Sequence, residues 1–298
     1  MTVRPSIFSW MSLQTATRFV GTLAVAAAVL ACSQNQKTGR PMEWTLVWSD
    51  DFDGKAGSPV DSSRWSYDTG DGCATGNCGW GNKEREYYSS AAENIALNGQ
   101  GQLVITARRA SSTLGCYYGP CLYTSAKIKT QGKALAGPGR VEARIKLPAG
   151  QGLWPAFWLL GSSVSTIPWP RCGELDIMEN HGRVPSQTSS AIHGPGYSGK
   201  TPFVHGDSLS RGTFSDDFHV FAVEWDSVRV RFFVDGAPHY TVTRKEVERY
   251  GPWVFDQPFF VILNLAVGGT FDGNPASDAI FPATMLVDYV RVYGPRRE

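Results

Sequence analysis

The chain has 298 residues, and 28 Lys and Arg against 27 Asp and Glu give a formal net charge of +1. This balance excludes the basic surface of a nucleic-acid-binding protein and an acidic interaction tail. Aromatic residues make up 12% of the chain, with ten Trp, 32 Gly and 18 Pro, which is typical of an all-β domain with many loops.

The N-terminal segment is predicted to be a targeting signal. Arg4 and Arg18 precede an apolar run at residues 19–31, too short to span a bilayer comfortably and typical of a signal-peptide core. The run leads into Val29-Leu30-Ala31-Cys32, which resembles a bacterial lipobox. We therefore expect residues 1–32 to be a signal segment cleaved before a lipidated Cys32, with an ordinary signal peptide as the alternative.

Either signal predicts export, to the bacterial cell envelope as a lipoprotein or to the medium as a secreted protein. Membrane contact is expected only through the lipid on Cys32, and we expect a monomer. Residues 33–43 are polar and are predicted to form a flexible tether. One continuous domain is expected to follow, over residues 44–298.

Strand-like runs recur throughout this domain without a linker or an internal repeat. Asp235-Gly236 lies between two runs and is typical of a hairpin turn. Many antiparallel strands separated by turn signals predict a sandwich of two stacked sheets, with residues 244–250 as the one modest helix candidate. The expected strands are residues 45–48, 103–107, 140–147, 157–160, 174–178, 189–193, 219–225, 229–234, 239–242, 259–265 and 285–293.

The run Glu174-Leu175-Asp176-Ile177-Met178-Glu179 places three carboxylates among apolar residues. Alternation predicts a strand with one buried and one open face, on which Glu174 and Asp176 share a side. A regular strand would turn Glu179 away, but a β-bulge at Ile177-Met178 would return it to the carboxylate face. Three neighbouring acids repel one another and need a reason, which glycoside hydrolysis supplies. A solvated acidic strand or a calcium site is the alternative.

The cysteines after Cys32 are interpreted as those of an exported protein. Disulfides Cys73–Cys78 and Cys116–Cys121 are the simplest pairing, although four cysteines allow three connectivities. A zinc site is the alternative, disfavoured because His residues are not nearby. Cys172, directly before Gly173-Glu174, is expected to be a buried, inert thiol.

The hexapeptide resembles the active-site strand of glycoside hydrolase family 16, in its bulged Glu-x-Asp-x-x-Glu form. The stretch Gly81-Asn82-Lys83-Glu84-Arg85-Glu86-Tyr87-Tyr88 is similar to the Gly-Asn-x-Glu-x-x-Tyr-Tyr run of laminarinase-like members. The resemblance implies an all-β, concanavalin-like β-jelly-roll with an open cleft. It also implies endo-acting hydrolysis of β-1,3-glucan or mixed β-1,3/1,4-glucan. Further matches lie at residues 153–160, 218–225, 234–236, 264–269 and 287–293.

By this resemblance Glu174 is the nucleophile, Glu179 the general acid/base, and Asp176 the residue that orients Glu174. A retaining enzyme needs two carboxyl groups roughly 5 Å apart, which long side chains on one strand face can provide. The negative charge of the cluster should raise the pKa of at least one member and help Glu179 to keep its proton.

Several other residues are candidates for substrate binding. Trp154 and Trp158 are four residues apart on a strand and are expected to form the floor of the cleft, with core packing as the alternative. His193 is expected on the neighbouring strand near the acid/base, where it would tune Glu179 unless it is structural. His181 is a weaker candidate.

Asn82, Glu84 and Arg144 are predicted to bind sugar hydroxyls. Glu84 could instead form a surface ion pair, and Arg144 could face solvent. The loop Thr270-Phe271-Asp272 stands where the family often has Asn-Trp-Pro, so its glucan contacts are in doubt.

No cofactor is expected for catalysis. Asp288 resembles the family's structural calcium ligand on the convex side, where carbonyl groups near Asp51 would complete the site. An Asp satisfied by hydrogen bonds is the alternative.

The leading hypothesis is an exported endo-β-1,3-glucanase that acts on β-glucan by retaining double displacement. The same fold and mechanism could serve agarose, carrageenan or lichenan. A non-catalytic glucan-binding sandwich is the alternative from a different class.

Overall fold

The computed structural model describes residues 44–111, 113–199 and 203–296. The predicted signal segment, Cys32 and the tether at residues 33–43 lie outside the described residues. No helix in the described part of the chain is long and apolar enough to cross a bilayer.

Strands dominate the described residues, and the helices are short. The strands are β1 Trp44–Asp50, β2 Ser66–Asp68, β3 Glu86–Tyr88, β4 Ile95–Leu97, β5 Leu103–Arg109, β6 Gly115–Cys116, β7 Gly119–Pro120, β8 Tyr123–Ser125, β9 Lys127–Lys129, β10 Gly139–Lys146, β11 Leu153–Gly161, β12 Glu174–Glu179, β13 Gln187–His193, β14 Phe203–Ser208, β15 His219–Trp225, β16 Arg229–Val234, β17 Ala237–Thr243, β18 Phe259–Val267 and β19 Ala283–Pro295. The helices are α1 Arg244–Val247, α2 Gly269–Asp272 and the 3-10 turns η1 Cys73–Thr75, η2 Cys78–Gly81, η3 Ser162–Ser165 and η4 Asp278–Ile280.

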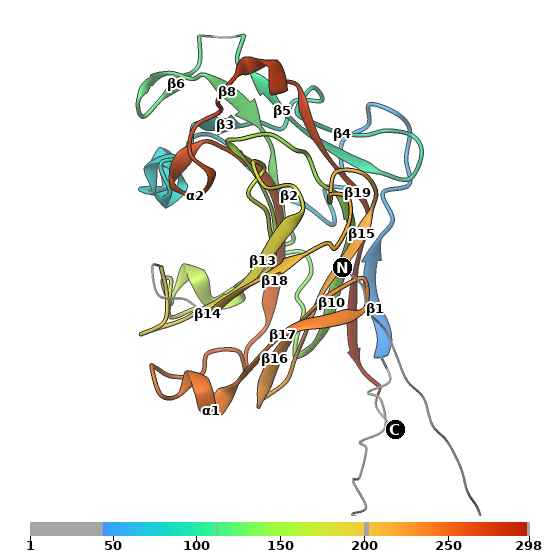
Figure 1. Cartoon of the computed structure of the whole chain (residues 1–298), viewed down its shortest axis with the longest axis vertical. Helices are drawn as coiled ribbons and strands as arrows, with labels where there is room; N and C mark the ends of the chain where they lie inside the picture. Colours follow the sequence, from blue (N-terminus) through green and yellow to red (C-terminus); the bar gives the residue numbers. More distant parts are fainter. Residues whose placement is uncertain (1–43, 112, 200–202, 297–298) are drawn as a thin grey trace, which may run out of the picture. The chain divides into compact units, whose positions relative to one another are not determined.

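Within the described residues, two large sheets enclose one hydrophobic core (Figure 1). The ten-stranded sheet has the order β17-β16-β15-β10-β19-β5-β8-β3, with β1 on β19 and β4 on β5. The seven-stranded sheet has the order β14-β13-β12-β11-β18-β9-β2. The predicted antiparallel sandwich is confirmed, with one exception, because β3 and β8 pair in parallel. A separate hairpin of β6 and β7 was not predicted.

The long predicted strands are all present, usually extended by one to four residues. The predicted hairpin at Asp235-Gly236 joins β16 to β17, and both residues have positive φ, as a type I′ turn requires. The predicted helix is shorter than expected, because α1 ends at Val247 and residues 248–250 form a turn. Thr243 begins α1 with a capping box, accepting from the backbone N–H of Glu246.

The predicted bulge in β12 is confirmed. In the pairing with β11 the register shifts between Asp176 and Met178, so Ile177 is the extra residue. Ile177 and Met178 both face the core and are almost fully buried. The shift leaves Glu179 on the same side of the sheet as Asp176.

A buried hydroxyl on the neighbouring strand completes the bulge. Ser190 of β13 is 1% exposed, and its Oγ donates to the carbonyl oxygen of Ile177 at 2.8 Å. A bulge disrupts the regular strand ladder, so a side-chain donor here satisfies a carbonyl that would otherwise be buried without a partner.

We predict that Ser190→Ala lowers the free energy of unfolding by about 1–3 kcal/mol, because the Ile177 carbonyl loses its donor in the interior. The melting temperature should fall by roughly 2–4 °C per kcal/mol. The matched control is Ser208→Ala on the adjacent strand, where the serine is exposed and the change should be small. Equal melting temperatures for both variants would show that the hydroxyl does not support the bulge.

Candidate active site

The three carboxylates of β12 lie in one row on the sheet face turned away from the core. Across the pairing with β11, Glu174 lies opposite Leu160, Asp176 opposite Trp158, and Glu179 opposite Ala156. Asp176 is only 5% exposed, and the two glutamates are half-buried. The predicted common face is therefore present.

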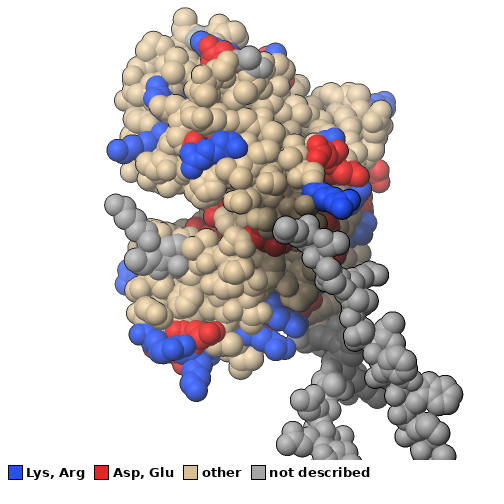
Figure 2. All heavy atoms as spheres, viewed as in Figure 1, with Lys and Arg blue, Asp and Glu red and all other residues tan. Residues whose placement is uncertain are grey.

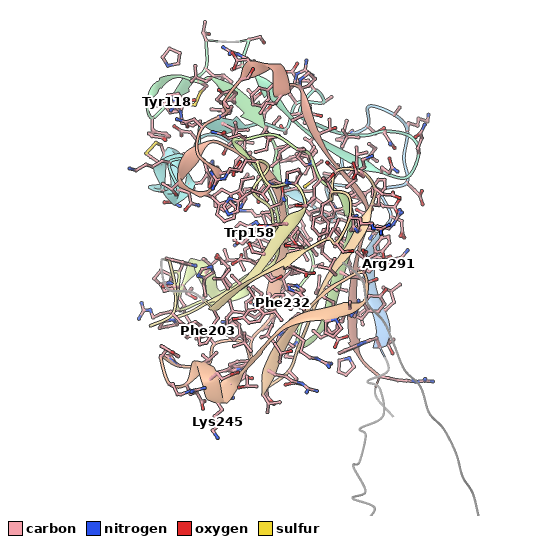
Figure 3. All side chains as sticks on the ribbon, viewed as in Figure 1. Tyr118, Trp158, Phe203, Phe232, Lys245 and Arg291 are labelled. Carbon is pink, nitrogen blue, oxygen red and sulfur yellow. A yellow bond between two sulfur atoms is a disulfide. The ribbon has the colours of Figure 1, made fainter. Side chains whose placement is uncertain are left out.

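This face borders a hollow in the molecular surface. In Figure 2 the hollow opens on the left at mid-height, and acidic atoms are visible within it. In Figure 3, Trp158 lies on this side of the seven-stranded sheet, whereas Arg291 lies beyond the ten-stranded sheet. A polymer could therefore approach the carboxylate row from solvent.

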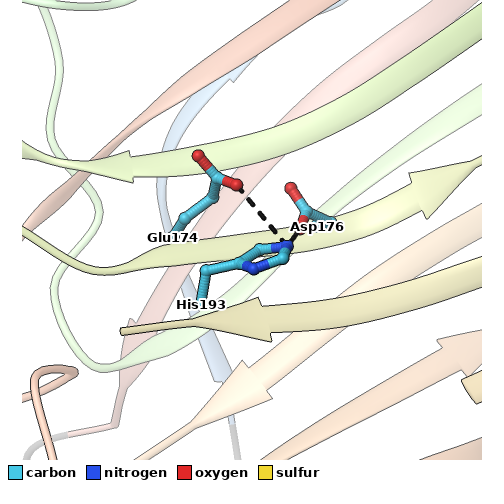
Figure 4. Close-up of side chains that lie close together, drawn as sticks. All are labelled: Glu174, Asp176 and His193. Atoms are coloured by element: carbon cyan, nitrogen blue, oxygen red, sulfur yellow. Dashed lines mark ion pairs between the residues drawn. The ribbon is translucent and has the colours of Figure 1, made fainter. Parts of the chain in front are cut away.

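His193 lies beside the carboxylates, on the neighbouring strand as expected (Figure 4). Its Nε2 is 3.0 Å from Asp176 Oδ2 and 3.7 Å from Glu174 Oε1. His193 therefore contacts the end of the row that carries Glu174. The sequence had predicted a position near the acid/base, Glu179. The reason is register, because His193 pairs with Glu174 and Ser189 pairs with Glu179.

Burial and mutual repulsion favour protons on this cluster. The pKa values of Glu174, Asp176 and Glu179 are each raised to about 8, mainly by removal from water. For both glutamates the charge of Asp176 contributes to this rise, and the charge of His193 opposes it. The three groups titrate together, so the cluster can hold a proton at neutral pH and also offer a carboxylate.

One His and two carboxylates could also hold a divalent cation. Glu174, Asp176 and His193 each offer a donor atom, all within 4.8 Å of one another. Metal binding would require these groups to be deprotonated.

Trp154 and Trp158 stand on the cleft face of β11, as predicted, and both are half-buried. The indole N–H of Trp154 donates to Glu179 Oε1 at 3.1 Å, which lowers the pKa of Glu179 and partly offsets its burial. Trp158 donates to Asn264 Oδ1 of β18 at 2.8 Å. Each indole is thus fixed at its edge by a hydrogen bond.

A stack of three rings fixes the Trp154 side of the cleft. Phe271 lies parallel to Trp154 with ring centroids 4.3 Å apart. His181 lies on the other face of Phe271, with ring centroids 3.8 Å apart. The sequence left the role of Phe271 open and rated His181 a weak candidate. The structure gives both a position beside Glu179, through Trp154.

Asp272 holds the loops that carry this stack. It is fully buried, accepts from the backbone N–H of Gly152 at 2.7 Å, and lies 3.3 Å from both His181 Nδ1 and Arg183 Nε. A buried carboxylate with these partners ties the start of β11 to α2 and to the turn after β12. Sequence reasoning missed this role because the partners are distant in the chain.

Asn82 and Glu84 lie behind Trp158 in a buried hydrogen-bond chain. Glu84 is 5% exposed and accepts from Asn82 Nδ2 at 3.1 Å and from the Tyr88 hydroxyl at 3.3 Å. Asn264 donates to the same hydroxyl at 3.2 Å, which connects the chain to Trp158. Glu84 is therefore not the surface ion-pair partner considered above. It supports the cleft from within.

The two disulfides are Cys73–Cys78 and Cys116–Cys121, the pairing that the sequence favoured as simplest. The first joins η1 to the start of η2, the turn that contains Trp80 and is followed by Asn82. Cys172 is a fully buried free thiol, and burial followed by the charge of Glu174 raises its pKa to about 11. This matches the expected inert thiol.

Arg144 does not belong to the site, and its predicted role in sugar binding is corrected. It lies on β10 of the ten-stranded sheet, where Ala143 and Ile145 face the core and Arg144 points outward. Its Nη1 is 2.9 Å from Asp288 Oδ2. Alternation placed Arg144 on an open face but could not show that this face lies away from the cleft.

The predicted calcium ligands have cationic partners. Asp288 pairs with Arg144, and Asp51 Oδ1 accepts from Arg291 Nη2 at 2.8 Å. These pairs satisfy both carboxylates without a metal ion. A Ca²⁺ ion at Asp288, held also by carbonyl groups near Asp51, stays a prediction.

Comparisons with known proteins agree on one family. The model of glycosyl hydrolases family 16 matches residues 82–291. A β-glucanase of Rhodothermus marinus is 38% identical over 91% of this chain and 93% of its own. An endo-β-1,3-glucanase structure from Pyrococcus furiosus is 46% identical, with a TM-score of 0.81 over 86% of this chain and 97% of its own. The laminarinase catalytic domain of Thermotoga maritima is 43% identical, with a TM-score of 0.80 over 86% of this chain and 100% of its own.

We predict that Asp176→Asn stabilises the fold at neutral pH. The pKa of Asp176 is raised in the folded state, so its destabilising effect is absent below about pH 4 and grows as pH rises toward 8. The variant should therefore melt roughly 2–8 °C above the wild type at pH 7.5, with a smaller gain at pH 4.

The control is Glu93→Gln, which removes an exposed carboxylate and should leave the melting curve unchanged at both pH values. If Asp176→Asn melts lower than the wild type at every pH, the contact with His193 outweighs the cost of burying this carboxyl group.

Proposed function

The chain belongs to glycosyl hydrolase family 16, and we propose on this basis that it is an endo-acting, retaining β-1,3-glucanase. The observation that carries the proposal is the row of Glu174, Asp176 and Glu179 on an open sheet face, beside Trp154 and Trp158. Two carboxyl groups close together beside aromatic rings match the needs of a retaining glycosidase for a β-glucan.

In the proposed first step, Glu174 attacks the anomeric carbon while Glu179 donates its proton to the glycosidic oxygen. The C–O bond to the leaving sugar breaks, and a glycosyl ester forms on Glu174. In the second step Glu179 accepts a proton from water, the water oxygen attacks the anomeric carbon, and Glu174 leaves as a carboxylate.

In this proposal, different neighbouring residues support the roles of Glu174 and Glu179. Asp176 and His193, 3.0 Å apart, flank Glu174 and would orient its carboxylate. Glu179 combines burial with the charge of Asp176, which raises its pKa and favours the proton that a general acid needs. Trp154 fixes one carboxyl oxygen of Glu179 by its indole N–H.

We predict that the mature domain releases reducing ends from laminarin, and that Glu174→Gln lowers the rate at least about a thousandfold. Barley mixed-linkage glucan, carboxymethylcellulose and agarose are assayed in parallel. The control Glu93→Gln has the same change of side chain on the exposed surface and should keep wild-type activity. Binding of laminarin by wild type without hydrolysis would favour the non-catalytic alternative, and faster release from another polymer would change the substrate.

Azide assigns the two glutamates within the same experiment. With an aryl β-glycoside of a glucan oligosaccharide as substrate, Glu174→Ala should yield the α-glycosyl azide, because azide replaces the missing nucleophile directly. Glu179→Ala should yield the β-glycosyl azide, because azide attacks the glycosyl-enzyme. The opposite pair of products would exchange the two roles.

We also propose that the protein is exported and attached to the membrane by a lipid on Cys32. In a bacterial host the wild type should fractionate with membranes and its N-terminal peptide should carry the mass of the lipid, whereas Cys32→Ala should lose both. An unmodified wild-type N-terminus in the medium would favour simple secretion.

A further inference from the structure

A buried lysine lies on the cleft side of the seven-stranded sheet. Lys127 of β9 is 9% exposed, and its Nζ is 4.5 Å from the ring centroid of Trp80 and 5.1 Å from that of Trp158. The ammonium therefore contacts one ring from η2 and one from the central strand β11. In register, Lys127 lies between Asn264 on β18 and Asp68 on β2.

The ion pair between Lys127 and Asp68 is long. Asp68 Oδ1 is 2.6 Å from Lys129, whereas its Oδ2 is 3.7 Å from Lys127. Burying an ammonium is costly unless other groups compensate. Two indole faces contribute here, because a desolvated cation–π contact adds up to about 2 kcal/mol. The ammonium also acts on the buried Glu84, where it opposes the burial that raises the pKa of that carboxyl group.

This arrangement fixes Trp158 from two directions. Asn264 holds the edge of the ring by a 2.8 Å hydrogen bond, and Lys127 stands over the ring. Trp80 reaches the same ammonium from η2, where its backbone has a positive φ of 52°. Loss of the ammonium would therefore loosen both rings together, while the hydrogen bond to Asn264 remained.

We propose that Lys127 is a positioning residue of this site. Its ammonium fixes the planes of Trp80 and Trp158 against the glucan. The inference rests on the proposed glucanase function and deepens it.

The charge acts on the proposed nucleophile. Glu174 shares its strand with Asp176 and Glu179 and lies 3.7 Å from His193 of β13, whereas Lys127 is on β9 of the same sheet. Asp176 and Glu179 raise the pKa of Glu174, whereas His193 and Lys127 lower it. Behind Glu174, Cys172 is a neutral thiol with a raised pKa.

The test compares Lys127→Met, Lys127→Arg and Lys129→Met. Methionine keeps much of the side-chain volume without the charge, and arginine keeps a cation for both rings. Lys129 is the matched control, because it lies two residues away on the same strand and shares Asp68. The pH profile of kcat/KM on laminarin is measured for each protein. The laminarin Kd is measured separately, with Glu174→Gln added to each protein.

For Lys127→Met we expect the acid limb of the profile to move to higher pH by roughly half a unit to one unit, because Glu174 needs a higher pH to ionise. Its laminarin Kd should rise about fivefold. Lys127→Arg and Lys129→Met should match the wild type in both readouts. A folded Lys127→Met protein with the wild-type profile and Kd would overturn the inference.

A second variant keeps the test decisive if Lys127→Met does not fold. Trp80→Leu removes one ring and leaves the charge, so laminarin binding should weaken while the acid limb stays in place. Wild-type binding by Trp80→Leu would overturn the positioning role. A wild-type enzyme that does not hydrolyse laminarin would instead refute the proposed function, so the two failures are distinguishable.

Discussion

Two consecutive side chains of β12, Ile177 and Met178, both pack into the core, and the cleft face depends on this break in alternation. A regular strand would send Glu179 into the hydrophobic interior, where a carboxyl group without a partner is strongly disfavoured. The extra residue turns Glu179 to the side of Glu174 and Asp176 instead. Ser190 satisfies the Ile177 carbonyl, so the bulge is built into the neighbouring strand as well as into β12. One local irregularity thereby creates the pair of carboxyl groups on which the proposed chemistry depends.

Gathering three carboxyl groups costs stability, and the surrounding side chains moderate that cost in different ways. His193 contacts Asp176 directly, Trp154 donates to Glu179, and the charge of Lys127 on β9 lowers the pKa of Glu174. None of them neutralises the cluster fully, so its pKa values stay high. This residual instability is useful for a glycosidase, because one carboxyl group must hold a proton while another is ionised. The fold therefore tolerates a local destabilisation that a larger number of cations would remove.

Patterns that act along one strand could be predicted from the sequence. The alternation in β10, the acidic run and bulge of β12 and the common face of Trp154 and Trp158 all follow from side-chain direction within a strand. Arg144 shows the limit of this reasoning. Alternation identified its open face, but the partner that decides its role, Asp288, lies 144 residues away. Short strands such as β2 and β14 were missed because three to six residues of mixed polarity carry little periodicity.

The unpredicted part of the site shares one physical property: each residue acts through a partner from a distant segment. Asp272 ties α2 to β11, Phe271 stacks between Trp154 and His181, and Lys127 contacts both Trp80 of η2 and Trp158 of β11. Such contacts leave no period in the sequence, since they depend on how loops return to the sheet. The reacting carboxylates come from one strand and are readable from it, whereas the walls that hold the sugar come from several loops. Substrate preference within this fold should therefore vary with the loops more readily than the mechanism does.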